Sequence, residues 1–288
     1  MLKFQKDPYA LPASGLFTRI RVARAVRAPT RTIEPARPRL ADPPGTRPRP
    51  ANPNEYAERF TMPNRHNIKV ERDMDGLRNT VLRMAAFSEA ILEKSLRAVW
   101  ERSTALSAEV VRDDLAIDRL DVDIDQAVLR ILALDAPVAS DLRLVVAIKA
   151  IATDLERVGD LARNIAGCAE RLTQREALPL PPGLHALAEE SRAALSAAIR
   201  SFSELDAEAA RTVLAADDSI DEQEDRLIRD AIARLSSSPE TTEQEVDLIF
   251  IAQNLERIGD HATNIAEETI LAAEAKNLKH HGKLARID

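Results

Sequence analysis

The sequence has few of the residues that build sheets, turns and disulfides. Its 288 residues include one cysteine (Cys168), eight glycines and only 3% aromatic residues. A single cysteine excludes an internal disulfide framework and suits a reducing compartment. Few aromatics and glycines, beside abundant Ala, Leu, Glu, Asp and Arg, favour long helices over sheets.

Long hydrophobic runs and the common nucleotide motifs are also missing. No apolar run approaches the ~20 residues that span a bilayer, and even residues 144–152 are interrupted by Lys149. No Gly-x-x-x-x-Gly-Lys-Ser/Thr loop occurs, so nucleotide chemistry has no support. We therefore expect a soluble, helical protein.

Charge is divided unevenly along the chain. Residues 1–61 carry 12 basic and 5 acidic side chains, whereas the remaining residues carry 28 and 42. An acidic body binds nucleic acid poorly, because phosphate contacts need Lys and Arg. It suits cations or basic partner surfaces instead.

The first 61 residues also hold 10 of the 16 prolines. A segment of this composition buries too little apolar surface to offset its ordering entropy, so we predict disorder there. Its basic character leaves two interpretations open, a targeting or membrane arm and an extension without a structural role.

From residue 68 onward, the apolar spacing predicts six long helices. They cover about 68–103, 107–134, 138–172, 184–205, 207–235 and 242–275. The expected fold is therefore all-α, with two tandem pseudo-symmetric antiparallel three-helix bundles. The expected domains are a disordered extension (1–61), a first bundle (62–173), a Pro-rich linker (174–183), a second bundle (184–276) and a tail (277–288).

One motif occurs twice, on the third and on the sixth predicted helix. Residues 152–166 read ATDLERVGDLARNIA, and residues 252–266 read AQNLERIGDHATNIA. An internal repeat with an offset of 100 residues predicts two related halves. In both copies the leucines, isoleucines and valines follow a heptad seam that faces the bundle core.

The acidic residues of the motif lie on the opposite side of that seam, one turn apart. The second and fifth helices carry acid-x-x-x-acid pairs of their own, so four carboxylates would meet on one patch in each half. Like charges at i,i+4 cost ~0.2–0.5 kcal/mol, and hard cations with oxygen ligands, such as Mg²⁺, Ca²⁺, Mn²⁺ or iron, relieve that repulsion. The alternative is that these acids are simply solvated.

Two further residue types in the motif invite interpretation. We expect Arg157 and Arg257 to pair with neighbouring carboxylates. Gly159 and Gly259 cost about 1 kcal/mol each inside a helix, which indicates a close approach of a neighbouring helix.

The doubled Glu-Arg-Ile/Val-Gly-Asp-x-Ala-x-Asn-Ile-Ala motif resembles that of the PhoU family of bacterial phosphate-transport regulators. The segment from Pro137 to Arg143, PVASDLR, resembles the family as well, and the likeness runs from about Met62 to the end of the sixth helix. The resemblance implies surface metal clusters, with divalent or iron ions (Fe, Mn, Mg or Zn) as cofactors. The implied ligands are Asp114, Asp118, Glu156, Asp160 and Asn164 in the first half, and Asp217, Asp221, Glu256, Asp260 and Asn264 in the second.

The resemblance also implies a function. We expect a non-enzymatic, cytoplasmic and homodimeric adaptor that restrains phosphate uptake and the phosphate-starvation response. Its expected partners are the ATPase subunit of the phosphate ABC transporter and a sensor histidine kinase, and we expect it to associate with the membrane only through them.

Two alternatives remain. One is a helical-bundle metalloprotein for storage or catalysis, although its Glu-x-x-His signature is absent. The other is a bare helical scaffold.

Overall fold

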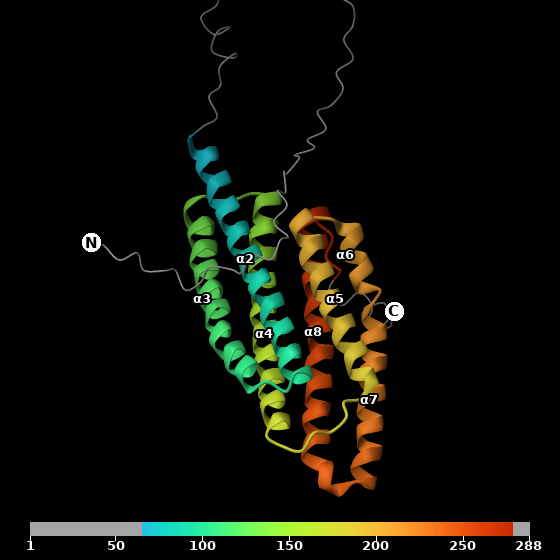
Figure 1. The fold of residues 1–288 in the computed structure, drawn as a ribbon. Helices are drawn as coiled ribbons and strands as arrows, with labels where there is room; N and C mark the ends of the chain where they lie inside the picture. The colour runs from blue at the N-terminus through green and yellow to red at the C-terminus, as the bar shows by residue number, and fades with distance from the viewer. Residues whose placement is uncertain (1–64, 279–288) are drawn as a thin grey trace, which may run out of the picture. The chain divides into compact units, whose positions relative to one another are not determined.

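The computed structural model describes residues 65–278, and all regular secondary structure in that range is helical. The first group of helices is α2 (Arg65–Trp100), α3 (Thr104–Leu134) and α4 (Ser140–Thr173). The second group is α5 (Pro182–Glu204), α6 (Ala207–Leu214), α7 (Asp217–Ser237), the short 3-10 helix η1 (Pro239–Thr241) and α8 (Thr242–Glu274). Figure 1 shows the two groups standing side by side.

This architecture confirms the all-α prediction of two tandem three-helix bundles. All the described helices belong to one compact unit of the chain, residues 60–288. The predicted disordered extension and most of the predicted tail lie outside the described residues. Among the helices of residues 65–278, none combines the length and apolar character that a membrane span requires.

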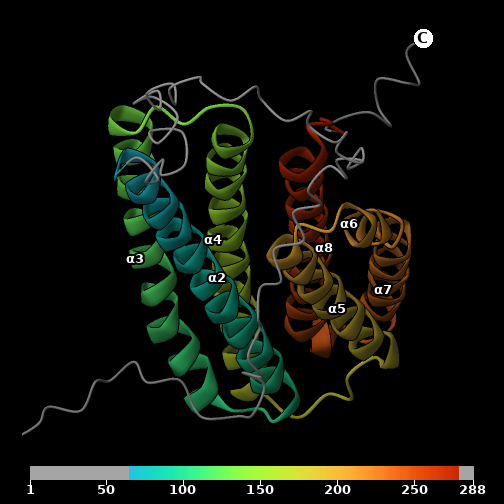
Figure 2. The same ribbon diagram turned by 90° about the horizontal axis from the view of Figure 1, so that it is seen from above.

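Helices α4 and α8 form the central pair of the molecule. They lie next to each other, with α2 and α3 on one side and α5, α6 and α7 on the other (Figure 2). Both bury their heptad seams, and the doubled motif supplies Leu155, Val158, Leu255 and Ile258 to one continuous hydrophobic core. Truncating one such leucine to alanine costs ~2–5 kcal/mol, so the motif is part of the core as well as of the surface.

The single helix predicted over 207–235 is wrong, because the chain forms two helices there. α6 ends at Leu214, and the backbone turns through Ala215 and Ala216, where the N–H of Ala216 donates to the carbonyl of Val213. Asp217 and Asp218 then occupy the first turn of α7. Asp is unfavourable inside a helix but favourable at the positive N-terminal end of the helix dipole, which explains a new start at this position.

Both motif glycines lie where another helix comes close. A Cβ atom added to Gly159 would lie 2.9 Å from Asp114 Oδ1 on α3, and one added to Gly259 would lie 2.9 Å from Ile220 Cδ1 on α7. Atoms of real side chains do not approach that closely, so only glycine permits this packing. The sequence-based explanation for these glycines therefore agrees with the structure.

We predict that Gly259→Ala destabilises the protein although it removes a helix-breaking residue. The added methyl would collide with Ile220, which is buried, and overpacking of this kind costs ~1–3 kcal/mol. Gly76→Ala is the matched control, because a Cβ at Gly76 meets nothing within 4 Å. The control should gain ~0.5–1 kcal/mol from helix propensity alone. Urea denaturation of both variants measures the difference, and equal stabilisation would contradict close packing at Gly259.

Candidate metal centre

The first carboxylate cluster lies where α3 packs on α4. It contains four of the predicted ligands, Asp114, Asp118, Glu156 and Asp160. Burial raises the pKa of Asp114; the charge of Arg163 opposes that increase, and the Asp118 and Asp160 carboxylates add to it. Burial, followed by the charge of Asp160, raises the pKa of Glu156. Carboxylates from both helices therefore lie within electrostatic reach of one another.

Basic side chains of the same protein pair with three of the four carboxylates, Asp114, Glu156 and Asp160. Arg163 donates from Nη1 to Asp114 Oδ2 at 2.8 Å and from Nη2 to Asp160 Oδ1 at 2.7 Å. Arg157 lies 3.4 Å from a carboxylate oxygen of Glu156 and 3.3 Å from one of Asp160, as expected for this arginine. The first cluster is thus a network of ion pairs in which the Asp114 carboxylate is almost fully buried.

The second carboxylate cluster lies where α7 packs on α8. It contains Asp217, Asp221, Glu256 and Asp260, and no ion pair joins any of these four to a basic side chain within residues 65–278. Burial, followed by the charge of Asp260, raises the pKa of Glu256 to about 7. Burial and the charge of Asp221 raise the pKa of Asp217 to about 6. Uncompensated negative charge therefore accumulates here.

The second cluster contains a fifth carboxylate, Glu224, which the sequence did not predict as a ligand. Glu224 contributes to the raised pKa of Glu256, so its side chain faces the same cluster. Its position follows from Asp217 and Asp221, because residues at i, i+4 and i+7 share one helix face. That spacing was available as a signal in the sequence. Asp121 plays the corresponding part in the first half, where Lys149 lies 3.3 Å from its carboxylate.

The two asparagines that were predicted as further ligands are engaged elsewhere. Asn164 donates from Nδ2 to Asn254 Oδ1 at 3.4 Å, and Asn264 donates from Nδ2 to Asp154 Oδ1 at 3.2 Å. Both contacts cross from α4 to α8. Positions 154 and 254 are equivalent in the repeat, and so are 164 and 264. The two contacts are therefore related by the pseudo-twofold symmetry of the halves. His261, whose Nδ1 lies 2.8 Å from Asp154 Oδ1, joins the same seam.

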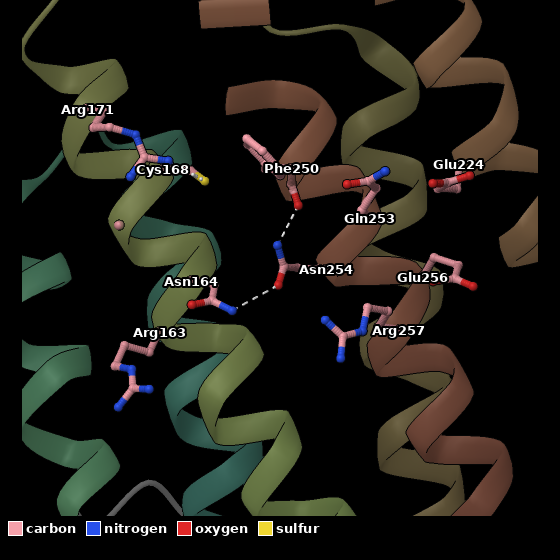
Figure 3. Close-up of a pocket in the computed structure, with 11 residues that line it drawn as sticks. Arg163, Asn164, Cys168, Arg171, Glu224, Phe250, Gln253, Asn254, Glu256 and Arg257 are labelled. Atoms are coloured by element: carbon pink, nitrogen blue, oxygen red, sulfur yellow. Dashed lines mark hydrogen bonds between the residues drawn. The ribbon is translucent and has the colours of Figure 1, made fainter. Parts of the chain in front are cut away.

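A groove of about 730 Å³ runs along the seam between α4 and α8. Figure 3 shows Asn164 and Asn254 facing each other across it, and Glu256 and Arg257 leaving α8 in opposite directions. Arg257 lines the groove and makes no hydrogen bond or ion pair with another described residue. The expectation that Arg257 pairs with the neighbouring carboxylates is therefore wrong. Glu224 and Glu256 also line this groove, but Arg257 leaves α8 in another direction from Glu256 and pairs with neither (Figure 3).

The second cluster fits a hard cation in its chemistry. All of its ligating atoms are carboxylate oxygens, which suit Mg²⁺, Mn²⁺ or iron rather than metals that prefer thiolates. Within residues 65–278, no three His, Cys, Asp or Glu side chains are so arranged that they would ligate one ion as they stand. Binding would therefore require rotation of carboxylate side chains, and Asp221 and Asp260 are exposed enough to rotate.

The fold and the repeated site define a class of protein, namely tandem three-helix-bundle proteins with an acidic motif on the third helix of each bundle. The PhoU domain model matches the chain twice, at residues 81–169 and 184–269. The chain belongs to the PhoU family.

Individual relatives cover the same region. The phosphate-specific transport system accessory protein PhoU homolog of Xylella fastidiosa (strain Temecula1 / ATCC 700964) is 34% identical over 216 residues, which are 75% of this chain and 90% of the relative. The homolog of Aquifex aeolicus is 32% identical over 213 residues, 74% of this chain and 96% of the relative. The crystal structure of PhoU from Pseudomonas aeruginosa superposes with a TM-score of 0.70 at 28% identity, covering 72% of this chain and 99% of that one.

We predict that Glu256→Gln stabilises the metal-free protein at pH 8 and not at pH 4. The pKa of Glu256 is raised from 4.5 to about 7 in the folded state, so the folded protein binds the proton more tightly than the unfolded chain does. Stability therefore falls as the pH rises from 4.5 to 7 and stays low above that range. Removing the charge should recover on the order of 1 kcal/mol at pH 8, after allowance for solvent screening.

Thermal unfolding in the presence of a chelator measures this effect. Glu170→Gln serves as the control, since Glu170 is exposed on α4 and outside both clusters. A stabilisation of Glu256→Gln that is equal at both pH values would contradict the electrostatic explanation.

Proposed function

We propose that this protein is a metal-binding cytoplasmic adaptor that restrains phosphate uptake and the phosphate-starvation response. It would act between the ATPase subunit of the phosphate ABC transporter and a sensor histidine kinase. The observation that carries the proposal is the match of the PhoU domain to both halves of the chain. The relatives' names, which place them with a phosphate-specific transport system, support it.

The expected homodimer is supported by an exposed apolar surface on α3. Val111, Leu115, Val122 and Leu129 follow one face of this helix, and their exposed fractions are 52–68%. A row of exposed apolar side chains on a helix is typical of a protein–protein contact. The spacing of seven residues from Leu115 through Val122 to Leu129 suits packing against a second helix. We call these four residues the apolar stripe and assign it to a homodimer contact, in which the stripe meets its own copy.

We expect deletion of the gene in its host to release phosphate uptake. In phosphate-rich medium the deletion strain should take up radiolabelled phosphate faster and express a starvation-responsive reporter, and the intact gene should reverse both effects. An enzyme or a storage protein on the same fold would leave the reporter under normal control. Normal repression in the deletion strain would overturn the proposed regulatory role.

We expect the second cluster to bind metal. Purified protein that has been stripped with EDTA and dialysed against MnCl₂ should retain Mn²⁺, because its uncompensated carboxylates supply hard oxygen ligands. The double variant Glu256→Ala, Asp260→Ala should lose that metal while it remains helical by circular dichroism. Inductively coupled plasma mass spectrometry counts the ions. Equal metal in the double variant and in the wild type would rule out this cluster as the site.

We expect Val122→Glu with Leu129→Glu to convert a dimer into a monomer. Two carboxylates in a stripe that meets its own copy would place four negative charges in one apolar contact. Ile232→Glu on α7 is the control, because Ile232 is also an exposed apolar side chain and lies outside the stripe. Sedimentation velocity separates the two states. A wild-type monomer, or a variant that still dimerises, would refute the assignment of the stripe.

A further inference from the structure

The two halves repeat the same carboxylates but not the same cations. With the offset of 100 residues that relates the two motifs, Lys149 corresponds to Ile249 and Arg163 to Thr263. In the first half, Lys149 pairs with Asp121, and Arg163 pairs with Asp114 and Asp160. The second half has an uncharged side chain at both equivalent positions.

Arg163 joins the two helices that form the first cluster. Its guanidinium contacts Asp114 on α3 at 2.8 Å and Asp160 on α4 at 2.7 Å, through separate nitrogens. The Asp114 side chain is only 3% exposed, so its charge depends on this arginine. The guanidinium therefore takes the position between the carboxylates that a bridging cation would need.

Thr263 behaves differently at the equivalent position. Its hydroxyl donates to the backbone carbonyl of Asp260 at 2.7 Å, so the side chain turns back onto its own helix. It brings no charge to the second cluster and blocks none of its carboxylates. Arg257, which could have supplied a cation, lines the seam groove that Glu224 and Glu256 also line, and it pairs with neither of them.

From these contacts we infer that the first cluster is closed to metal, and that Arg163, with support from Arg157 and Lys149, is the internal cation that replaces it. This inference rests on the proposed metal binding, and it confines that binding to the second half. A metal ion bound by Asp114 and Asp160 would have to compete with Arg163, which donates hydrogen bonds to Asp114 Oδ2 and Asp160 Oδ1. It would also bring its charge close to a guanidinium that is protonated at every accessible pH.

The test is to open the first cluster by the substitution that the repeat itself suggests. Arg163→Thr gives the first half the residue of the second half, and Arg163→Lys keeps a positive charge at the same position. Both variants and the wild type are stripped with EDTA, dialysed against MnCl₂ and analysed for Mn²⁺ per chain. Circular dichroism and thermal unfolding report whether each variant is folded.

Arg163→Thr should bind about twice as much Mn²⁺ as the wild type, since two equivalent sets of oxygen ligands would then be open. Arg163→Lys should bind as much as the wild type. Adding Glu156→Ala and Asp160→Ala to Arg163→Thr should remove only the gained metal, whereas the same two substitutions in the wild type should remove none. Hydrogen exchange gives an independent readout: Mn²⁺ should protect amides of α7 and α8 in the wild type, and those of α3 and α4 only in Arg163→Thr.

The contrary outcomes separate this inference from the proposed function. Loss of metal from the wild type on Glu156→Ala and Asp160→Ala would overturn the inference and leave the proposed metal binding in place. So would an Arg163→Thr variant that is folded, carries metal in its second half and gains none. A wild type that binds no Mn²⁺, beside an Arg163→Thr variant that does, would overturn only the proposed second site. Absence of Mn²⁺ from every variant would overturn both.

Discussion

The short distance at which α3 packs on α4, and α7 on α8, determines where charge accumulates in this protein. Because Gly159 and Gly259 have no Cβ, the neighbouring helix approaches until Asp114 or Ile220 touches the glycine. Acidic side chains one turn to either side are then brought from both helices onto one narrow strip beside a dry core. Burial there disfavours their charged forms, as the raised pKa values of Asp114 and Glu256 show. The charge of such a strip is relieved by protonation of a carboxyl group or by a cation, and a cation can come from the chain or from solution.

The two halves differ in whether the chain itself supplies a cation to the carboxylates. In the first half the chain supplies the cation, and Arg163 bridges Asp114 and Asp160. In the second half, no basic side chain among the described residues pairs with the four carboxylates. Burial, followed by the charge of Asp260, raises the pKa of Glu256 to about 7, because ionisation is disfavoured beside these carboxylates. Two differences between the halves, Arg163 against Thr263 and Lys149 against Ile249, therefore separate an ion-paired cluster from an unpaired one.

The sequence predicted the features that depend on periodicity. The heptad seam, the number of bundles and the close approach at the glycines all follow from spacing along one chain, and the structure has them. The sequence did not predict the break between α6 and α7, because alanine is favourable in any helix. The turn at Ala215 and Ala216 depends on Asp217 and Asp218, which begin helix α7. Nor did the sequence predict the directions of Arg257 and Asn164, which lie at the border between two faces of their helices. Only the packing of α4 against α8 decides which side each of them takes.

The repeat has been kept in the core and has diverged at the surface, so the two halves present surfaces of different chemistry. Two identical halves would present the same surface twice and would bind two copies of one partner. Here the outer face of α3 carries the apolar stripe, whereas its counterpart α7 presents charged side chains such as Glu222, Arg226 and Arg229. An apolar face beside an internally neutralised cluster and a charged face beside an uncompensated one are chemically different surfaces. With the apolar stripe assigned to the homodimer contact, the charged face of α7 is left for other proteins, so one duplicated fold presents two surfaces of different chemistry.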